Sequence, residues 1–101
     1  VALHVKLLAC FREAKGPDGD VATMGPTDCR TGAEILKFVR TVMRKDVTIL
    51  IDLARSYHVV KELCEIIRQQ IADPYLLTEA CAMLTLIMYH NAIRMEYIRF
   101  V

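Results

Sequence analysis

The residues that interrupt helices and strands are confined to one short part of this 101-residue chain. All four glycines and two of the three prolines fall between residues 16 and 32. Glycine and proline weaken helix interiors, and proline cannot donate to the ladder of a central strand. We therefore expect a flexible Gly/Pro loop over 16–31 and regular secondary structure on either side of it.

The apolar residues on both sides of that loop recur at helical spacing. No run of β-branched residues alternates with polar ones, which a half-buried strand would require. The pattern predicts an all-α protein of roughly six helices, which cover residues 2–15, 31–44, 46–54, 56–70, 73–89 and a last segment from 91 onward.

Several of the predicted helices begin at a recognisable start signal. Thr31 and Glu34 have the spacing of a capping box, in which each side chain bonds a backbone amide of the other residue. Asp46 and Ser56 are predicted N-caps. Asp73 is followed by a proline, which is typical of a helix start because proline at the first helical position loses no amide partner.

More than half of the side chains are apolar, which is more than a domain of this size easily buries. Hydrophobic residues make up 54% of the chain, and the mean hydropathy is +0.31. A small domain buries only about 60–65% of the surface that its unfolded chain exposes. We therefore expect a single helical domain over 1–101, a fragment of a longer protein, whose remaining apolar surface meets another chain or sequence outside this one.

Charge and cysteine usage argue against several classes of function. Thirteen Lys and Arg residues balance twelve Asp and Glu residues, so no global field favours nucleic acid. The longest strongly apolar stretch, 80–89, is far shorter than the roughly 20 residues that cross a bilayer. The four cysteines lack metal-ligand spacing, and we expect no secretion signal. We expect an intracellular protein, cytoplasmic or nuclear, with no cofactor, metal or membrane contact.

The chain shows an internal repeat when it is shifted by 48 residues against itself. Without a gap, the shift aligns apolar residues and pairs Ala33 with Cys81, Ile35 with Met83, Leu36 with Leu84, Phe38 with Leu86, Val39 with Ile87, Val47 with Met95, Ile49 with Tyr97 and Leu50 with Ile98. A period in the forties built from helices indicates a solenoid repeat of two or three helices.

The stretch from Val60 to Ile98 resembles an armadillo repeat or its HEAT-type relative. The matching residues are Val60, Leu63, Ile66 and Ile67 in a short helix, Ala72-Asp73-Pro74 in a turn, and Ala80 to Ile87 in a long inner helix. The resemblance covers about 40 residues and, through the repeat, about 70. It implies a right-handed α-solenoid fragment of about two repeats.

Two positions depart from the armadillo pattern. Armadillo proteins that grip extended peptides bond the ligand backbone with an asparagine, which is replaced here by Phe38 in one repeat and Leu86 in the next. The glycine usual between the first two helices would fall near His58. We therefore expect a groove that buries apolar surface, such as that of a partner helix, in place of an extended-peptide clamp.

The resemblance places a candidate binding surface on the inner helices. The concave side would carry Phe38, Thr41 and Lys45 from one repeat and Ala82, Leu86, Tyr89 and His90 from the next. A basic stripe at the rim would consist of Lys37, Arg40 and Arg44. Structural alternatives stay open: the apolar residues pack as core against a neighbouring helix, and the stripe complements the helix dipole.

Other candidate groups carry a weaker signal. His4, His58 and His90 are far apart in sequence, and only His58 has an acidic residue, Glu62, at helical spacing. Cys29 lies in the expected loop, and we expect it to be the exposed cysteine of the chain. Its thiol is the candidate for a thiol-dependent enzyme or a redox sensor.

The sequence therefore predicts a non-catalytic protein–protein interaction module or scaffold. It would dock a helix or linear segment of another protein, acidic where it meets the basic rim, in an apolar groove. The alternative is a structural helical bundle that self-associates through its apolar ends, Val1 to Phe11 and Met95 to Val101. Nucleic acid is not an expected partner, because no aromatic residues interleave the basic stripe.

Overall fold

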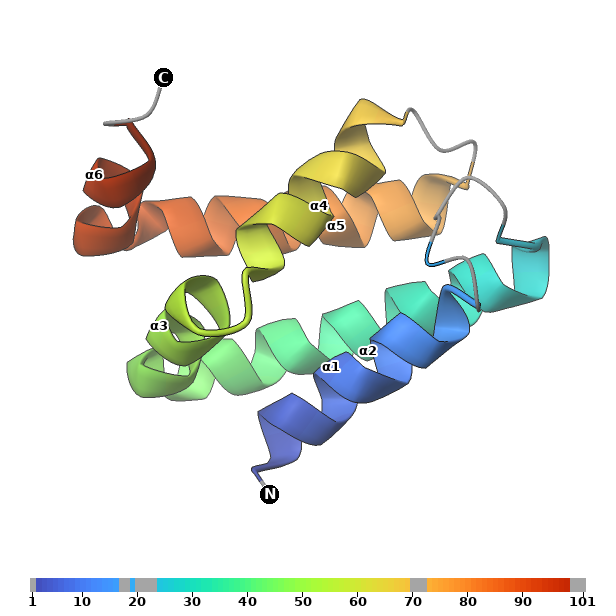
Figure 1. Cartoon of the computed structure of the whole chain (residues 1–101), viewed down its shortest axis with the longest axis horizontal. Helices are drawn as coiled ribbons and strands as arrows, with labels where there is room; N and C mark the ends of the chain where they lie inside the picture. The colour runs from blue at the N-terminus through green and yellow to red at the C-terminus, as the bar shows by residue number, and fades with distance from the viewer. Residues whose placement is uncertain (1, 17–18, 20–23, 70–72, 99–101) are drawn as a thin grey trace.

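The chain folds into six helices within the part that the structure describes (Figure 1). This computed structural model describes residues 2–16, 19, 24–69 and 73–98, and no strand occurs in these ranges. The helices are α1 (Leu3–Ala14), α2 (Pro26–Lys45), α3 (Val47–Arg55), α4 (Val59–Arg68), α5 (Pro74–Tyr89) and α6 (Asn91–Ile98). The prediction of an all-α protein is confirmed.

Two predicted helix starts are confirmed by side-chain caps. The Asp46 carboxylate accepts a hydrogen bond from the backbone amide of Thr48 at 2.9 Å, directly before α3. The Asp73 carboxylate accepts from the amides of Tyr75 and Leu76, both at 3.0 Å, at the start of α5. Each carboxylate satisfies amides that the helix itself leaves without a partner.

The second helix, α2, begins at Pro26 and not at Thr31. Gly25 is its N-cap, and proline stands at the first helical position, where its missing amide hydrogen is no loss. The predicted loop over 16–31 is therefore wrong in its last six residues, and the predicted capping residue Thr31 lies inside the helix. The centre of that predicted loop lies outside the described residues.

The glycine inside α2 is explained by the packing of α1 on α2. A Cβ atom added to Gly32 would lie 3.2 Å from the ring of Phe11, which is itself buried in the core. That distance is tighter than most Cβ contacts, so a side chain at this position would require the Phe11 ring to shift by a few tenths of an ångström. Gly32 therefore serves helix packing and not a loop.

The fourth helix begins later than the sequence suggests. Ser56 ends α3, where its amide donates to the Asp52 carbonyl at 2.8 Å, and it does not cap α4. α4 starts at Val59, after His58 adopts the left-handed backbone conformation with φ of 55°. The turn between α3 and α4 thus takes up the residues predicted to begin the helix. The predicted end of this helix at Gln70 lies outside the described residues.

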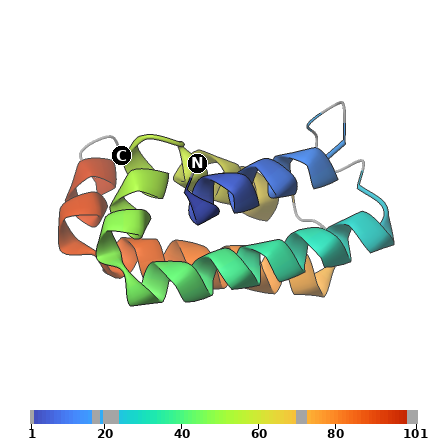
Figure 2. The ribbon, with the colours of Figure 1, turned by 90° about the horizontal axis from the view of Figure 1, so that it is seen from below.

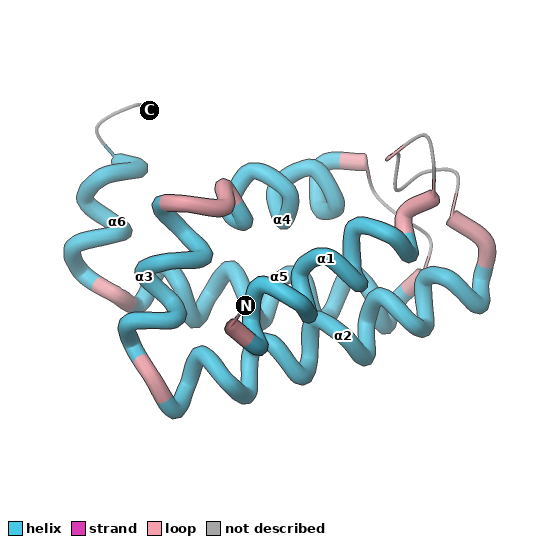
Figure 3. The backbone as a smooth tube through the Cα atoms, turned by 60° about the horizontal axis from the view of Figure 1, so that its bottom comes forward, coloured by secondary structure: helices cyan, strands magenta, loops and turns pink. Residues whose placement is uncertain are grey.

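The helices pack in two layers. α2 and α5 lie side by side and run in the same direction, and α1 and α4 cross them from the other layer in the opposite sense (Figure 1, Figure 2). α3 leads from the end of α2 to α4, and α6 follows the end of α5 (Figure 3). The thickness of 21 Å along the shortest axis matches two helix diameters. The right-handed solenoid stays a prediction.

One hydrophobic core lies between the layers. Every helix contributes to it at least one fully buried side chain, and one example from each is Phe11, Val39, Leu53, Leu63, Met83 and Ile93. The described helices therefore share a common core, which fixes α2 and α5 relative to each other.

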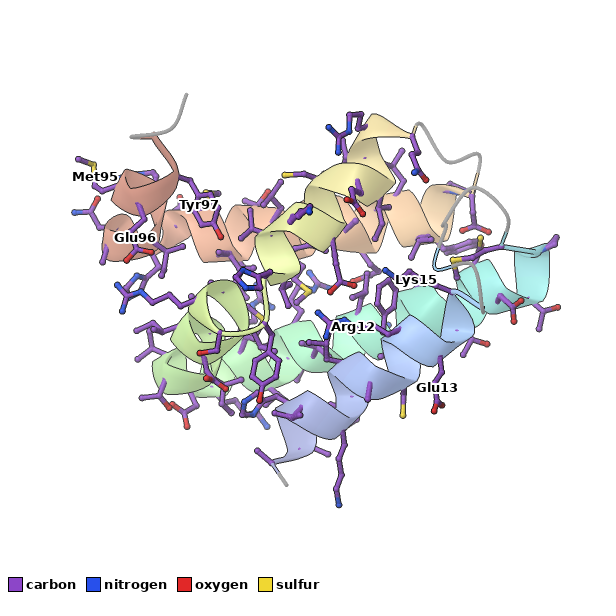
Figure 4. The ribbon with its side chains drawn as sticks, in the orientation of Figure 1. Arg12, Glu13, Lys15, Met95, Glu96 and Tyr97 are labelled. Carbon is purple, nitrogen blue, oxygen red and sulfur yellow. The ribbon has the colours of Figure 1, made fainter. Side chains whose placement is uncertain are left out.

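A cluster of charged side chains joins α1 to α4. The Glu62 carboxylate accepts hydrogen bonds from Arg12 Nε at 2.8 Å and from Lys15 Nζ at 3.1 Å. Arg12 also donates to the backbone carbonyl of Tyr57 at 2.8 Å. Figure 4 shows Arg12 and Lys15 on the side of α1 that faces α4, with Glu13 on the opposite side. This cluster holds the two helices of the second layer together.

Two further polar side-chain contacts tie α3 to its neighbours. His4 Nε2 of α1 lies 2.7 Å from a carboxylate oxygen of Asp52. Arg55 donates from Nε to Glu96 of α6 at 2.9 Å, and Glu96 is labelled in Figure 4. α3 is thus fixed between the start of α1 and the last described helix.

Candidate functional site

The residues predicted to bind a partner lie on, or directly after, the parallel helices α2 and α5. α2 carries Lys37, Phe38, Arg40, Thr41, Arg44 and Lys45, α5 carries Ala82, Leu86 and Tyr89, and α5 is followed by His90. The structure therefore brings both halves of the predicted surface into one layer of the fold (Figure 2).

A hollow of about 490 Å³ lies between the first half of α2 and the start of α5. Lys37 is the predicted residue that lines it, and the other lining residues are Ala33, Glu34, Pro74, Tyr75, Thr78 and Glu79. Its walls thus combine two carboxylates, one ammonium group and a phenol. Such a mixed lining suits a polypeptide segment better than a single small charged ligand.

Arg40 has a structural partner. Its Nη2 atom lies 3.1 Å from Oε2 of Glu79 in α5, and both side chains are mostly buried. The Arg40 Nε atom and the Glu79 Oε2 atom are buried without a well-directed hydrogen bond from any described residue. The charges attract at this distance, but the geometry is poor. Arg40 therefore joins α2 to α5 more than it extends toward a partner.

Lys37 and Arg44 are the exposed members of the predicted basic stripe. They are seven residues apart, so their side chains leave the same face of α2. No ion pair joins either one to a residue in the described ranges. Arg44 follows Arg40 by four residues, so it lies about one turn beyond the Arg40–Glu79 pair along α2.

The wall that α5 contributes is uncharged apart from Glu79. Ala82 and Leu86 follow Glu79 by three and seven residues, so they share its face, and both are half-buried. Tyr89 at the end of the helix is 82% exposed. Its exposure is that of a surface residue and not of a core residue. His90 has a capping role, because its Nδ1 accepts from the amide of Ile93 at 3.4 Å.

Phe38 lines a different hollow. This second hollow, of about 420 Å³, lies between α1 and α2, and Leu7 and Ile35 line it together with Phe38. Phe38 is 55% exposed, so it is not core. The structure does not bring Phe38 into the hollow that Lys37 shares with α5. The neighbouring hydroxyl of Thr41 donates to the carbonyl of Lys37 at 3.0 Å, within α2.

An aromatic stack that the sequence analysis missed joins the starts of α2 and α5. The guanidinium carbon of Arg30 lies 3.9 Å from the ring centroid of Tyr75. This is a close cation–π contact, and both residues are exposed. Arg30 precedes Lys37 by seven residues and therefore extends the basic stripe by one more position. The seven-residue spacing could have added Arg30 to the stripe, but no local pattern indicated its contact with Tyr75.

The expectation that Cys29 is exposed is wrong. Because α2 begins at Pro26, Cys29 lies in its first turn and faces the core, with 4% of its surface exposed. Burial raises the pKa of the Cys29 thiol, and the nearby charges of Asp73 and Asp28 raise this pKa further. A thiol held neutral in this way is a poor nucleophile. The exposed cysteines are Cys10, Cys64 and Cys81.

The histidines do not come together. His4 is paired with Asp52 and His90 caps α6. Glu62, the acidic residue near His58 in sequence, is bound by Arg12 and Lys15 instead. Within the described ranges, no three His, Cys, Asp or Glu side chains are close enough to hold a metal ion.

No described helix is by itself both long and apolar enough to cross a membrane. α5 and α6 together have sufficient length, but they are bent by 103°.

Comparison with known proteins gives no match: no protein family, curated protein or solved structure is similar to this chain.

Proposed function

We propose that this chain is a non-catalytic protein–protein interaction module of the armadillo or HEAT kind, with about two repeats in a right-handed solenoid. It docks a helix or linear segment of another protein on the surface formed by α2 and α5. The four cysteines are free thiols, which favours a reducing setting in the cytoplasm or nucleus.

The arrangement of the long helices supports the repeat. α2 and α5 begin at Pro26 and Pro74, which are 48 residues apart, the same shift that aligns the sequence with itself. Parallel packing of equivalent helices is what stacked repeats require. His58, at the position where the armadillo pattern has glycine, has the left-handed φ of 55° that glycine adopts most readily.

The observation that carries the proposed function is the contrast between the two walls of the α2/α5 surface. α2 contributes exposed cations, Lys37 and Arg44, and α5 contributes apolar and aromatic side chains, Leu86 and Tyr89. Tyrosine and arginine are enriched among residues that dominate binding energy at interfaces. A surface of this kind complements an amphipathic polypeptide.

The experiment selects peptides from a random display library on the wild-type chain and measures their affinities. We expect the double variant Leu86→Ala/Tyr89→Ala to lose at least roughly tenfold in affinity for the selected peptides, since two contact side chains are removed. Circular dichroism confirms that the variant stays folded. The matched control is Leu3→Ala/Met95→Ala, which removes two exposed apolar side chains away from this surface.

Two results would overturn the proposed function. One is that no peptide is selected, and the other is that the selected peptides bind the Leu86→Ala/Tyr89→Ala variant as well as they bind the wild-type chain. Equal losses in this variant and in the Leu3→Ala/Met95→Ala control would also contradict the assignment, because the effect would then not belong to the α2/α5 surface.

A second candidate function is structural self-association. Leu3 near the start of the chain and Met95 near its end are both exposed large apolar residues, as the alternative requires. Light scattering over a range of concentrations measures the solution mass. A mass that rises to a dimer in the wild-type chain but not in Leu3→Ala/Met95→Ala would favour this candidate. A monomer at all concentrations would rule it out.

A further inference from the structure

The basic stripe of α2 has a regular interval. Arg30, Lys37 and Arg44 follow one another at seven-residue steps, and all three are exposed. At a rise of 1.5 Å per residue, successive cations are about 10 Å apart along the helix. No ion pair joins any of them to a residue of the described chain. The stripe therefore presents three cations without an ion pair at a fixed interval, and the exposed Glu34 lies between the first two.

Arg30 is oriented by its stack on Tyr75. The guanidinium carbon lies 3.9 Å from the ring centroid, so the aromatic ring holds the cation by a close cation–π contact. The N–H groups point outward in the guanidinium plane, where they match the two oxygens of a carboxylate. The stack thus places an anion-binding group at the first position of the row without consuming its hydrogen-bonding edges.

The opposite wall has a different character. Beyond Tyr75, the face of α5 next to α2 carries Ala82 and Leu86, and its charged residue, Glu79, is already paired with Arg40. A partner that complements both walls needs carboxylates along one side and apolar side chains along the other. A polyphosphate chain does not meet this requirement, because it has no apolar side chains for the α5 wall.

The seven-residue interval favours a helical conformation of an acidic, amphipathic partner over a β-strand. A helix that lies along α2 has the same rise per residue, so carboxylates seven residues apart on it meet successive cations. In an extended strand about three residues span 10 Å, and side chains an odd number of residues apart point to opposite faces. A regular β-strand therefore places carboxylates that are about 10 Å apart on opposite faces, and it fits the interval less well than a helix does.

We infer that the partner of the α2/α5 surface is an acidic amphipathic α-helix with carboxylates at seven-residue intervals. It lies along α2, with its carboxylates at Arg30, Lys37 and Arg44 and its apolar face on Ala82 and Leu86. This inference rests on the proposed function and specifies the chemistry and form of the partner.

The test compares two synthetic, fluorescein-labelled helical peptides of about 18 residues, or five turns. The in-register peptide has glutamate at seven-residue intervals and leucine on the adjacent face. The displaced peptide has the same composition, with its glutamates moved one at a time to different faces of the helix. Fluorescence anisotropy at low salt measures their affinities for the folded chain. We expect the in-register peptide to bind roughly fivefold to tenfold more tightly.

Variants that remove charge test whether the basic stripe causes the preference for the in-register peptide. Lys37→Gln/Arg44→Gln should bring the affinity for the in-register peptide down to that for the displaced one. The matched control is Lys61→Gln/Arg68→Gln on α4. Lys61 and Arg68 are also exposed and also seven residues apart, so the control makes the same change in charge at the same spacing. The control should keep the preference for the in-register peptide.

Equal affinities for the two peptides, or equal losses in the α2 and α4 variants, would overturn the inference, because net charge alone would then explain binding. The proposed function would survive that result if library-selected peptides still depended on Leu86 and Tyr89. Selected peptides that are proline-rich and extended would likewise overturn the helical partner while leaving the module intact. Tighter binding of a uridine oligonucleotide through Lys37 and Arg44 would overturn the choice of a protein partner.

Discussion

At the residue scale, Gly32 occupies a position where helix propensity and packing oppose each other. Alanine is favoured over glycine in a helix interior by about 1 kcal/mol. The buried ring of Phe11, however, would lie 3.2 Å from a Cβ at this position, and the surrounding core leaves the ring little room to move. The packing requirement outweighs the propensity, so a glycine that resembles a loop residue in the sequence belongs to a helix crossing.

Gly32→Ala should therefore lower the free energy of unfolding by about 1 kcal/mol, since the strain of an overpacked core exceeds the gain in helix propensity. Urea denaturation measures the change. In a Phe11→Leu background the same substitution should be neutral or stabilising relative to Phe11→Leu alone, because the smaller side chain makes room for the Cβ. Identical effects in both backgrounds would show that the contact with Phe11 is not the cause.

At His58, in contrast, a substitution to glycine is expected to stabilise the fold. Its left-handed backbone brings the Cβ too close to the following carbonyl, a cost of about 1–2 kcal/mol that glycine avoids. We expect His58→Gly to raise the free energy of unfolding by about 0.5–1 kcal/mol, after the greater freedom of glycine in the unfolded chain is subtracted. His58→Ala, which removes the imidazole but keeps the Cβ, is the control. A glycine variant less stable than the alanine variant would contradict this explanation.

At the scale of the helices, a side-chain cap decides which starts could be predicted. Asp46 and Asp73 cap α3 and α5 with carboxylates, and both starts follow from the sequence. α2 and α4 begin after Gly25 and His58, neither of which makes a side-chain cap bond. Without that local signal, the prediction chose the nearest capping residue, which placed the start too late in α2 and too early in α4.

The ion cluster between α1 and α4 is another property of the helices as units. Glu62 is mostly buried and accepts hydrogen bonds from Arg12 and Lys15, so Glu62→Ala removes the carboxylate that pairs with both cations. We expect a loss of about 1–2 kcal/mol in unfolding free energy, reduced from the buried-pair range because Arg12 is partly exposed. Glu65→Ala, one turn away on α4, is the control and should change stability by less than about 0.5 kcal/mol. Hydrogen exchange should show faster opening of α1 in the Glu62 variant.

At the scale of the whole molecule, the candidate site combines features that the sequence encodes with features that it does not. The interval from Lys37 to Arg44 is local, and the sequence shows it directly. The pairing of Arg40 with Glu79 and the stack of Arg30 on Tyr75 join residues about 40 positions apart, and no local pattern specifies which partners meet. Only the packing of α2 beside α5 decides which cations stay free for a partner.

The same packing places Cys29 in the core shared by all six helices, so its reactivity reports on the whole fold. Its thiol is buried and has a raised pKa, and both effects suppress the thiolate. With a thiol reagent near pH 8, we expect the exposed cysteines Cys10, Cys64 and Cys81 to react at once and Cys29 to react only through unfolding. Peptide mass spectrometry assigns each modified residue.

A variant that weakens the core distinguishes global unfolding from local opening. Leu53 of α3 is fully buried and distant in sequence from Cys29, and Leu53→Ala should destabilise the fold by about 3 kcal/mol. The modification of Cys29 should then be roughly 100-fold faster, while the rates of the three exposed cysteines stay unchanged. If Cys29 reacted as fast as Cys10 in the wild-type chain, or if Leu53→Ala left its rate unchanged, α2 would open independently of the core. A surface that depends on α2 and α5 lying side by side would then lack the fixed geometry that the proposed helix docking requires.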